Sequence, residues 1–173
     1  KKPANLLKAI LPKESGKVEL AFDSKNACFK LSDFVLNCRL IEGNYPNYNS
    51  VIPTNNPNRL IIDRALFVNV LRRVSVFAGL AKLQLKNGEL VVSTENKDYS
   101  ISAEEKVACN YTGDDLTIGF KASFLIEILN NISATEVLVE LSDPTRAGVI
   151  LPLENKENED LLMLLMPMML SDF

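Results

Sequence analysis

Residues 63–74, DRALFVNVLRRV, decide the fold of this chain, because their apolar side chains recur at the spacing of an amphipathic helix. Residues 120–132, FKASFLIEILNNI, have the same spacing and align with the first stretch without gaps, with Phe67 over Phe124. Residues 1–11, KKPANLLKAIL, form a third stretch of this kind. The sequence therefore predicts three helices, and the alignment of two of them indicates an internal repeat.

Strand-like segments surround each predicted helix in the same order. After residues 63–74 come AKLQLK and ELVVSTE, joined by Asn87 and Gly88, a pair typical of a two-residue hairpin turn, and then DYSISAEEKVA. Three alternating apolar segments also follow the other two helices, and the short strands RLII and LTIGF lead into the second and third helices. The repeat of about 57 residues predicts an α+β fold of β-α-β-β-β units, with the helices on one face of a continuous antiparallel sheet.

The repeats also predict the domain organisation. Two units make one domain, so residues 59–173 are predicted to form a complete domain. Residues 1–53 hold a single unit that begins at its helix, without a leading strand or a partner unit, and they are predicted to be the second half of another domain. Residues 54–58 lie in a segment rich in proline and asparagine and are predicted to be the linker.

Composition argues against most kinds of enzyme. The chain has no histidine, which removes the commonest general base and metal ligand, and it has no glycine-rich phosphate-binding loop. We therefore expect no cofactor and no metal. The three cysteines, Cys28, Cys38 and Cys109, are widely spaced and predict buried free thiols in a reducing compartment, the cytoplasm. No apolar run reaches the ~20 residues that a membrane span needs.

Charge is unevenly distributed along the chain. The net charge is −3, yet the three predicted helices together carry an excess of lysine and arginine, which leaves the rest of the chain acidic. This pattern is expected if the helices meet a polyanion such as DNA, through its phosphates and without sequence specificity. Solvated helix faces would give the same pattern, so the charges alone leave both interpretations open.

The most hydrophobic stretch of the chain lies three residues from its end. Residues 161–170, LLMLLMPMML, are apolar apart from the proline at position 167. Pro167 cannot donate to a strand ladder, so the last residues are expected to leave the sheet and turn toward the linker. Residues 161–165 are expected to be a core strand, whereas the flexible methionines that follow favour a groove that binds varied partners. Core packing of the whole stretch is the alternative.

Three parts of the sequence together resemble a known family. IEGNYPNYNSVIP at 41–53, the aligned helix pair and LLMPMML at 164–170 are similar to the bacterial DNA polymerase III beta subunit, the sliding clamp, and the resemblance covers essentially all 173 residues. The family implies the DNA-clamp fold and a homodimeric ring of head-to-tail subunits, each with three similar domains. By this resemblance the chain holds the second half of the middle domain and the whole C-terminal domain.

The resemblance also implies a function. Such a ring encircles duplex DNA, has no catalytic activity of its own, and gives processivity to the replicative DNA polymerase. The polymerase, the clamp loader and other proteins that carry a clamp-binding motif insert a short peptide into a hydrophobic groove. We therefore expect a cytoplasmic replication protein with DNA and protein partners and no membrane contact.

Residue by residue, the resemblance implies three sites. The partner-peptide groove would consist of Pro46, Ser50, Val51, Phe124, Thr145, Ala147, Leu164, Leu165, Met166, Pro167, Met168 and Met169. The DNA-facing residues would be Lys1, Lys2, Lys8, Arg72 and Arg73. The subunit contact would consist of Val76, Phe77, Glu104 and Glu105, with the glutamates on an edge strand. Tyr45 and Tyr48 flank Pro46 and either pin the linker or contact the ligand.

The sequence departs from the family pattern in a few places. Residues 74–85, VSVFAGLAKLQL, are a shorter connection between helix and strand than the family usually has. Ser50 and Met169 stand where many members have a basic residue, and SDF extends beyond the usual end.

Two other functions stay open from the sequence. A small enzyme dependent on carboxylates or lysines would use the apolar C-terminal segment as a substrate pocket, with Glu157, Glu159 and Asp160 as the nearest titratable groups. These lie in ENKENED, residues 154–160, which is typical of a solvated loop. A protein-interaction module without a DNA role would fit the acidic composition but leaves the positive helices unexplained.

Overall fold

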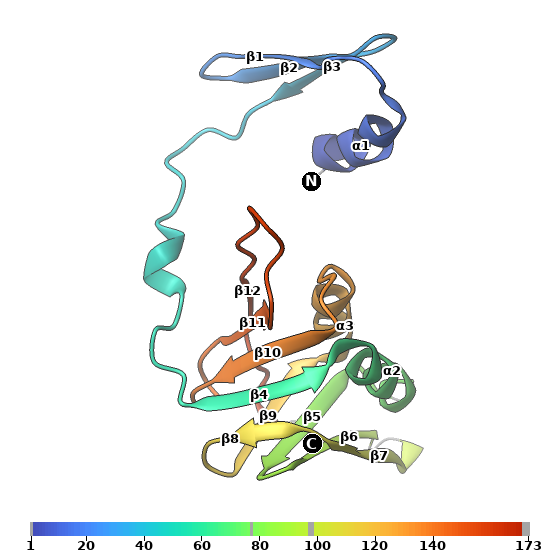
Figure 1. The fold of residues 1–173 in the computed structure, drawn as a ribbon, viewed down its shortest axis with the longest axis vertical. Helices are drawn as coiled ribbons and strands as arrows, with labels where there is room; N and C mark the ends of the chain where they lie inside the picture. The colour runs from blue at the N-terminus through green and yellow to red at the C-terminus, as the bar shows by residue number, and fades with distance from the viewer. Residues whose placement is uncertain (1, 77, 97–98, 171–173) are drawn as a thin grey trace. The chain divides into compact units, whose positions relative to one another are not determined.

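The computed structural model describes residues 2–76, 78–96 and 99–170 and divides into two compact units, Lys1–Asn47 and Tyr48–Phe173. We call them the N-terminal unit and the C-terminal unit and describe each by itself. The predicted helices and strands occur in the predicted order, with one additional strand (Figure 1). Residues 48–58, which the sequence analysis divided between the first region and the linker, belong to the C-terminal unit.

The N-terminal unit contains one α-helix and a three-stranded antiparallel sheet. Its elements are α1 (Lys2–Ile10), the 3-10 helix η1 (Leu11–Lys13), β1 (Glu19–Phe22), β2 (Asn26–Lys30) and β3 (Val35–Arg39), with strand order β1-β2-β3. Of its described residues, only Ala27 and Leu31 are buried. Leu20, Phe22 and Val35 are 56%, 76% and 59% exposed. The N-terminal unit therefore has almost no hydrophobic core of its own.

A carboxylate connects the helical end of the N-terminal unit to its sheet. Glu14 accepts hydrogen bonds from the backbone N–H of Ser32 at 3.0 Å and from the Ser32 hydroxyl at 2.6 Å. Ser32 lies between β2 and β3, so these contacts join η1 to the opposite turn. The Ser32 hydrogen bonds lower the pKa of the Glu14 carboxyl, because they stabilise its ionised form.

The C-terminal unit holds the two aligned helices. Its elements are the 3-10 helix η2 (Tyr48–Val51), β4 (Asn58–Asp63), α2 (Arg64–Val74), β5 (Leu80–Lys86), β6 (Glu89–Asn96), β7 (Ile101–Ala108), β8 (Asn110–Thr112), β9 (Leu116–Lys121), α3 (Ala122–Asn130), β10 (Glu136–Leu141), β11 (Gly148–Pro152) and β12 (Met163–Leu165). The two repeats are β4-α2-β5-β6-β7 and β9-α3-β10-β11-β12. The predicted repeat is therefore confirmed, and β8 was not predicted. Gly88 has φ +77 in the β5–β6 turn, as the Asn87-Gly88 hairpin requires.

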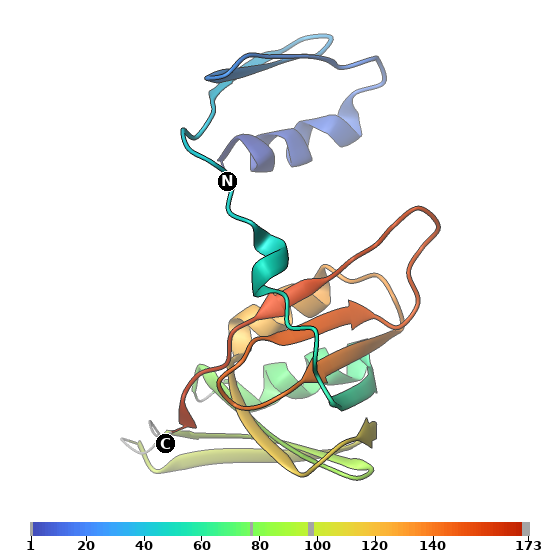
Figure 2. The same cartoon turned by 90° about the vertical axis from the view of Figure 1, so that its left-hand side faces the viewer.

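The predicted continuous sheet is wrong, because the strands form two antiparallel sheets in the orders β12-β11-β10-β4-β8 and β7-β6-β5-β9. Each leading strand pairs with the strands of the other repeat, as in Leu60 opposite Val139 and Leu83 opposite Ile118. The helices explain this exchange. α2 contacts β4 in one sheet and β6 and β7 in the other, so it carries the chain from the first sheet to the second. α3 likewise contacts β9 and β12, and the two helices lie side by side (Figures 1 and 2).

The hydrophobic core lies between the helices and the two sheets. The largest fully buried side chains are Phe67, Phe120, Leu60, Leu71, Leu83, Leu85, Leu90, Ile118, Leu125, Leu129, Leu141 and Ile150. Two polar side chains, Asn58 and Thr94, are buried among the described residues. Asn58 is 5% exposed, donates to the carbonyl of Ser142 at 2.9 Å and accepts from the N–H of Asp114 at 3.0 Å. Asn58 thus joins the start of β4 to β10 and to the turn after β8.

The end of the chain connects the two sheets. β12 pairs with β11 only over Met163–Leu165, and the backbone N–H of Met168 then donates to the carbonyl of Gly119 on β9 at 2.8 Å. The expected turn toward the linker after Pro167 is therefore wrong for the described residues, which run to the four-stranded sheet instead (Figure 2). Gly119 permits this contact, since a Cβ there would lie 2.7 Å from Leu170 Cδ2 and 3.1 Å from the Met168 carbonyl oxygen.

Candidate functional site

The two aligned helices bury different faces. α2 buries Phe67, Val68, Val70, Leu71 and Val74, whereas α3 buries Ala122, Leu125 and Leu129. Phe67 and Phe124 align in sequence, yet Phe67 is 0% exposed and Phe124 is 50% exposed. Leu71 is likewise fully buried, whereas its counterpart Ile128 is only partly buried. Phe124 and Ile128 therefore form an uncovered apolar surface, the α3 strip, that has no counterpart on α2.

A cavity of about 560 Å³ lies beside the α3 strip. It is lined by Phe124, Glu127, Ile128 and Asn131 of and after α3, and by Met163, Leu164 and Leu165 of β12. The first four residues follow one helix face, at i, i+3, i+4 and i+7. The cavity thus combines an apolar wall from β12 with the outer face of α3, and we call it the α3 cavity.

A second hollow, of about 580 Å³, shares Leu164 with the α3 cavity. It is lined by Tyr48, Asn49, Ile52, Asp160, Leu162 and Leu164. The 3-10 helix η2 supplies two of these residues, so it brings the segment after Asn47 beside the start of β12. We call this the η2 hollow. The η2 segment therefore meets the C-terminal stretch before β12 ends, and not after Pro167 as expected.

The methionines that follow β12 lie at the surface. Leu165 is 7% exposed and belongs to the core, whereas Met166 and Met169 are 64% and 69% exposed and Met168 is 41% exposed. Core packing of the whole stretch is therefore not what the structure shows. Flexible, polarizable side chains at the surface are available to contact another molecule.

The other predicted groove residues lie outside the two hollows. Thr145 is exposed between β10 and β11, and Ala147 is buried at the end of the same turn. Ser50 and Val51 are exposed on η2, and Pro46 belongs to the N-terminal unit. Of the predicted groove residues, those that the structure brings together around the two hollows are Phe124, Leu164 and Leu165.

Sequence reasoning missed several residues of the two hollows. Glu127 and Ile128 could have been found, because they follow Phe124 at helical spacing. Ile52 and Leu162 could not have been found in this way, since they lie far apart in the chain and no local sequence pattern pairs them.

Charged side chains bracket the α3 strip. Lys121, at the N-cap position of α3, places Nζ 4.7 Å from the centroid of the Phe124 ring, within the range of a cation–π interaction. Glu127 lies one helical turn after Phe124 and contributes the one charged side chain among the described lining residues of the α3 cavity. Arg64 of α2 donates to the carbonyl of Ala134 at 2.8 Å and to that of Leu129 at 3.4 Å, so it caps the end of α3 from the side of α2.

The predicted DNA-facing residues have different surroundings. Lys2 and Lys8 are exposed on α1, while Lys1 lies outside the described residues. Arg72 is exposed in the last turn of α2, with Nη2 3.5 Å from Asn130 Oδ1. A cation in the last turn also interacts favourably with the helix dipole.

Arg73 is paired within the fold. Its Nε donates to Glu105 Oε2 at 3.0 Å, and its Nη2 donates to the other carboxylate oxygen of Glu105. The guanidinium lowers the pKa of the Glu105 carboxyl. The structure thus joins a residue predicted to face DNA to a residue predicted for the subunit contact, across α2 and β7.

β7 is an edge strand of the four-stranded sheet, as expected for the strand that bears Glu104 and Glu105. Neighbouring strand residues point to opposite faces, so Glu105 points toward α2 and Glu104 points away. Val76, predicted for the same contact, is 72% exposed. Phe77 lies outside the described residues.

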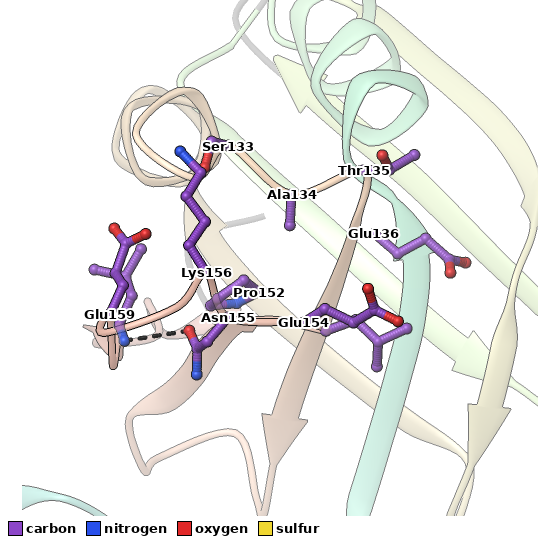
Figure 3. Close-up of a pocket in the computed structure, with 11 residues that line it drawn as sticks. Ser133, Ala134, Thr135, Glu136, Pro152, Glu154, Asn155, Lys156 and Glu159 are labelled. Atoms are coloured by element: carbon purple, nitrogen blue, oxygen red, sulfur yellow. Dashed lines mark hydrogen bonds between the residues drawn. The ribbon is translucent and has the colours of Figure 1, made fainter.

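A third cavity, of about 380 Å³, lies where the loop after α3 meets the loop after β11 (Figure 3). It is lined by Ser133, Ala134, Thr135, Glu136, Pro152, Leu153, Glu154, Asn155, Lys156, Glu159 and Leu161. The N–H of Leu161 donates to Asn155 Oδ1 at 3.4 Å across its mouth. Among the carboxylates named for the enzyme alternative, Glu159 lines this cavity, whereas Asp160 lines the η2 hollow. The three carboxylates therefore do not converge on one site.

Two features are absent from the described residues, a metal-binding cluster and a membrane-spanning helix. Over residues 2–76, 78–96 and 99–170, no group of three or more His, Cys, Asp or Glu side chains is arranged to hold a metal ion. Within those same ranges, no helix has the length and apolar character needed to cross a bilayer. Cys28, Cys38 and Cys109 are free thiols, but the predicted burial is wrong, because all three are only partly buried.

Residues 49–169 match the family described as DNA polymerase III beta subunit, C-terminal domain. The chain is 27% identical over 169 residues to the beta sliding clamp of Pseudomonas aeruginosa, covering 95% of this chain and 45% of that protein. It is 31% identical over 160 residues to the beta sliding clamp of Treponema pallidum, covering 88% and 42%. The chain thus spans less than half the length of these relatives.

Solved structures show the same similarity. A sliding clamp from Bartonella birtlesii bound to griselimycin superposes with a TM-score of 0.86 at 30% identity, covering 96% of this chain and 45% of that one. The DNA polymerase III subunit beta of Pseudomonas aeruginosa superposes with a TM-score of 0.89 at 26% identity, covering 98% and 46%.

Proposed function

Because the chain belongs to the DNA polymerase III beta subunit family, the sliding clamps, we propose that it is part of a non-catalytic clamp subunit that recruits partner proteins through a peptide groove. The intact subunit would close with a second copy into a ring around duplex DNA. The ring would confer processivity on the replicative DNA polymerase in the cytoplasm. The polymerase, the clamp loader and other proteins with a clamp-binding motif would be its partners.

One observation carries this proposal: α3 leaves Phe124 and Ile128 uncovered beside a cavity walled by β12, where α2 buries the equivalent residues. Uncovered aromatic and aliphatic side chains in a hollow are the usual anchor points of short peptides. The exposed Met166, Met168 and Met169 extend this apolar surface along the end of the chain.

The N-terminal unit supports the proposed domain organisation. Leu20, Phe22 and Val35 are more than half exposed, as expected of half a domain whose other half would cover its sheet. We therefore propose residues 1–53 as the second half of the middle clamp domain, 54–58 as a linker and 59–173 as the C-terminal clamp domain, with residues 48–58 packed on the C-terminal unit. Pro46, Ser50, Val51, Thr145, Ala147 and Pro167 remain proposed groove residues alongside those that line the hollows.

The proposed DNA contact rests on exposed basic residues of the helices. Lys2 and Lys8 on α1 and Arg72 on α2 are exposed, and we keep Lys1 as proposed. Arg73 would contribute less, because Glu105 neutralises its charge. Replacing Lys2, Lys8 and Arg72 together by alanine should reduce the slope of log affinity against log salt by up to about three contacts of ~0.9 each, whereas Arg73→Ala alone should change it least.

The proposed subunit contact lies along the edge strand β7. Its unpaired side offers backbone groups to a strand of another subunit, and Glu104 favours a basic neighbour there. Val76, Phe77 and Glu105 would complete the contact. Sedimentation of the full-length gene product tests this ring. A protein that sediments as a monomer, both with and without the Glu104→Lys substitution, would contradict it.

Binding to the groove is tested by titration. A short peptide with Leu and Phe anchors should bind the wild-type chain, and so should griselimycin in a separate titration. Phe124→Ala should weaken the binding of each ligand about tenfold, since burying one apolar anchor is worth about 1.5–3 kcal/mol. Truncation after Leu165 should abolish binding while leaving most of the fold, because it removes mainly surface residues. Normal peptide binding by the truncated chain, with a large fall in melting temperature, would show that the segment is core only.

A protein-interaction module without a DNA role is the second candidate. The pairing of Arg73 with Glu105 favours it, because it removes one predicted phosphate contact. The same salt titration decides between the two, since this module would show no DNA binding at any salt concentration.

A further inference from the structure

The charges along α3 have the reverse order of those that stabilise a helix. A helix favours acidic groups at its N-terminus and basic groups at its C-terminus, because its dipole is positive at the start. α2 follows this rule, with Asp63 capping its first turn and Arg72 and Arg73 in its last turn. α3 instead begins at Lys121 and carries Glu127 near its end. Helix stability therefore does not account for these two charges.

Contacts within the fold do not account for the Glu127 carboxylate either. Its backbone carbonyl accepts from Asn131 Nδ2 at 2.8 Å, but the carboxylate itself makes no hydrogen bond or ion pair with any described residue. Two basic side chains that contact α3 are engaged elsewhere: Lys121 stacks on Phe124, and Arg64 donates to backbone carbonyls at and after the end of α3. Glu127 thus presents an unmatched negative charge at the α3 cavity.

We propose that Glu127 selects partner peptides that carry a lysine or arginine beside the apolar anchor seated on Phe124 and Ile128. This inference rests on the proposed peptide groove and names the chemistry of its occupant. The apolar wall of Met163, Leu164 and Leu165 holds the anchor, and the adjoining carboxylate attracts the cation. Lys121, at the opposite end of the strip, repels a second cation and favours an acidic residue there, so the two charges also fix the direction in which the peptide lies.

The expected preference is modest and can be measured. Exposed ion pairs contribute about 0.2–1 kcal/mol, so a peptide with lysine next to its anchor should bind about 1.4- to fivefold more tightly than the same peptide with glutamate at that position. The preference should shrink as salt is added, because the pair is exposed. It should appear for lysine on one side of the anchor and not on the other.

The test compares three peptides with one anchor, flanked by lysine, glutamine or glutamate, titrated onto the whole chain by fluorescence anisotropy. Glu127→Gln should abolish the preference for the lysine peptide without changing the affinity for the glutamine peptide. Glu127→Lys should reverse the preference, so that the glutamate peptide binds most tightly. Glu159→Lys, an exposed substitution in a different cavity, is the matched control and should leave the preference unchanged. Melting temperatures should agree among the variants, because both glutamates are exposed.

The outcomes separate this inference from the function on which it rests. Equal binding of all three peptides to the wild type would overturn the role of Glu127 and leave the peptide groove standing. Failure of every peptide and of griselimycin to bind would overturn the groove itself. Self-association of the chain that Phe124→Ala abolishes would assign the α3 strip to a second copy and would also overturn the inference.

Discussion

α2 and α3 begin from the same sequence pattern and end in different roles. Phe67 and Phe124 occupy equivalent positions, but α2 packs mainly against β4, β6 and β7, whereas α3 packs mainly against β9 and β12. β7 has eight residues and its counterpart β12 has three. The short third strand of the second repeat therefore leaves α3 uncovered. Helical spacing therefore predicts an apolar face, whereas the length of the neighbouring strand determines whether that face is covered as core or left exposed.

The largest expected difference between the helices is in stability. Phe67→Ala should cost about 3–5 kcal/mol of unfolding free energy, because it empties a fully buried site, whereas Phe124→Ala should cost much less because half of that ring is already exposed. Urea denaturation of the two variants measures both values. The comparison fails if the two substitutions destabilise the chain equally.

The next effect concerns the contact between β9 and the end of the chain. Gly119→Ala should cost about 1–3 kcal/mol and weaken peptide binding, because the new methyl group pushes Met168 and Leu170 away from β9 and displaces the exposed methionines at 166, 168 and 169. Thermal melting and peptide titration measure the two consequences.

Gly79→Ala is the matched control for this substitution, since nothing lies within 4 Å of a Cβ at that position. It should leave stability and peptide binding close to those of the wild type. A Gly119→Ala variant that behaves like this control would show that the tail is not held by β9.

A smaller difference is expected at the helix starts. The Asp63 side chain accepts from the N–H of Leu66 at 2.7 Å, whereas the residue at the start of α3, Lys121, makes no capping hydrogen bond. Asp63→Ala should therefore cost about 1 kcal/mol, and Lys121→Ala should cost less. Equal losses in urea denaturation would mean that the cap contributes nothing to the difference between the helices.

The smallest expected effect is the pH dependence of the ion pair at the end of α2. Arg73 lowers the pKa of Glu105 in the folded state, so the pair stabilises the fold fully above the ordinary carboxyl value of 4.5, and this stabilisation is lost as pH falls through the lowered pKa. Glu105→Gln should lower the melting temperature slightly at neutral pH and have no effect in strong acid. Glu104→Gln, on the same strand, is the control and should show no such pH dependence.

Local features of the structure were predictable from the sequence, and long-range pairing was not. All three helices occur within two residues of their predicted ends, because apolar spacing reports the helix directly. β8 was missed, since Asn110–Thr112 is a strand only through its pairing with β4. The two-sheet arrangement was missed for the same reason, because β4 pairs with β10 across most of the unit.

The candidate site was predictable only in part. The C-terminal methionines and Phe124 could be named from the resemblance to the clamp family, and their exposure agrees with a surface role. Glu127 and Ile128 follow Phe124 at helical spacing and could have been named with it, but their exposure could not be predicted, because it depends on how little of α3 is covered by β12. The ion pair between Arg73 and Glu105 could not be predicted, because no sequence pattern gives the distance between α2 and β7.

The exchange of leading strands between the repeats has a consequence for synthesis of the chain. Neither repeat can complete a sheet until the other exists, because β4 must find β10 and β5 must find β9. Such distant pairing is slow, since the entropy of loop closure is lost before the contacts form. A chain emerging from the ribosome must therefore deliver β10, β11 and β12 before the five-stranded sheet closes. The apolar surface formed by the α3 strip and β12 therefore appears only on a molecule in which both repeats have folded.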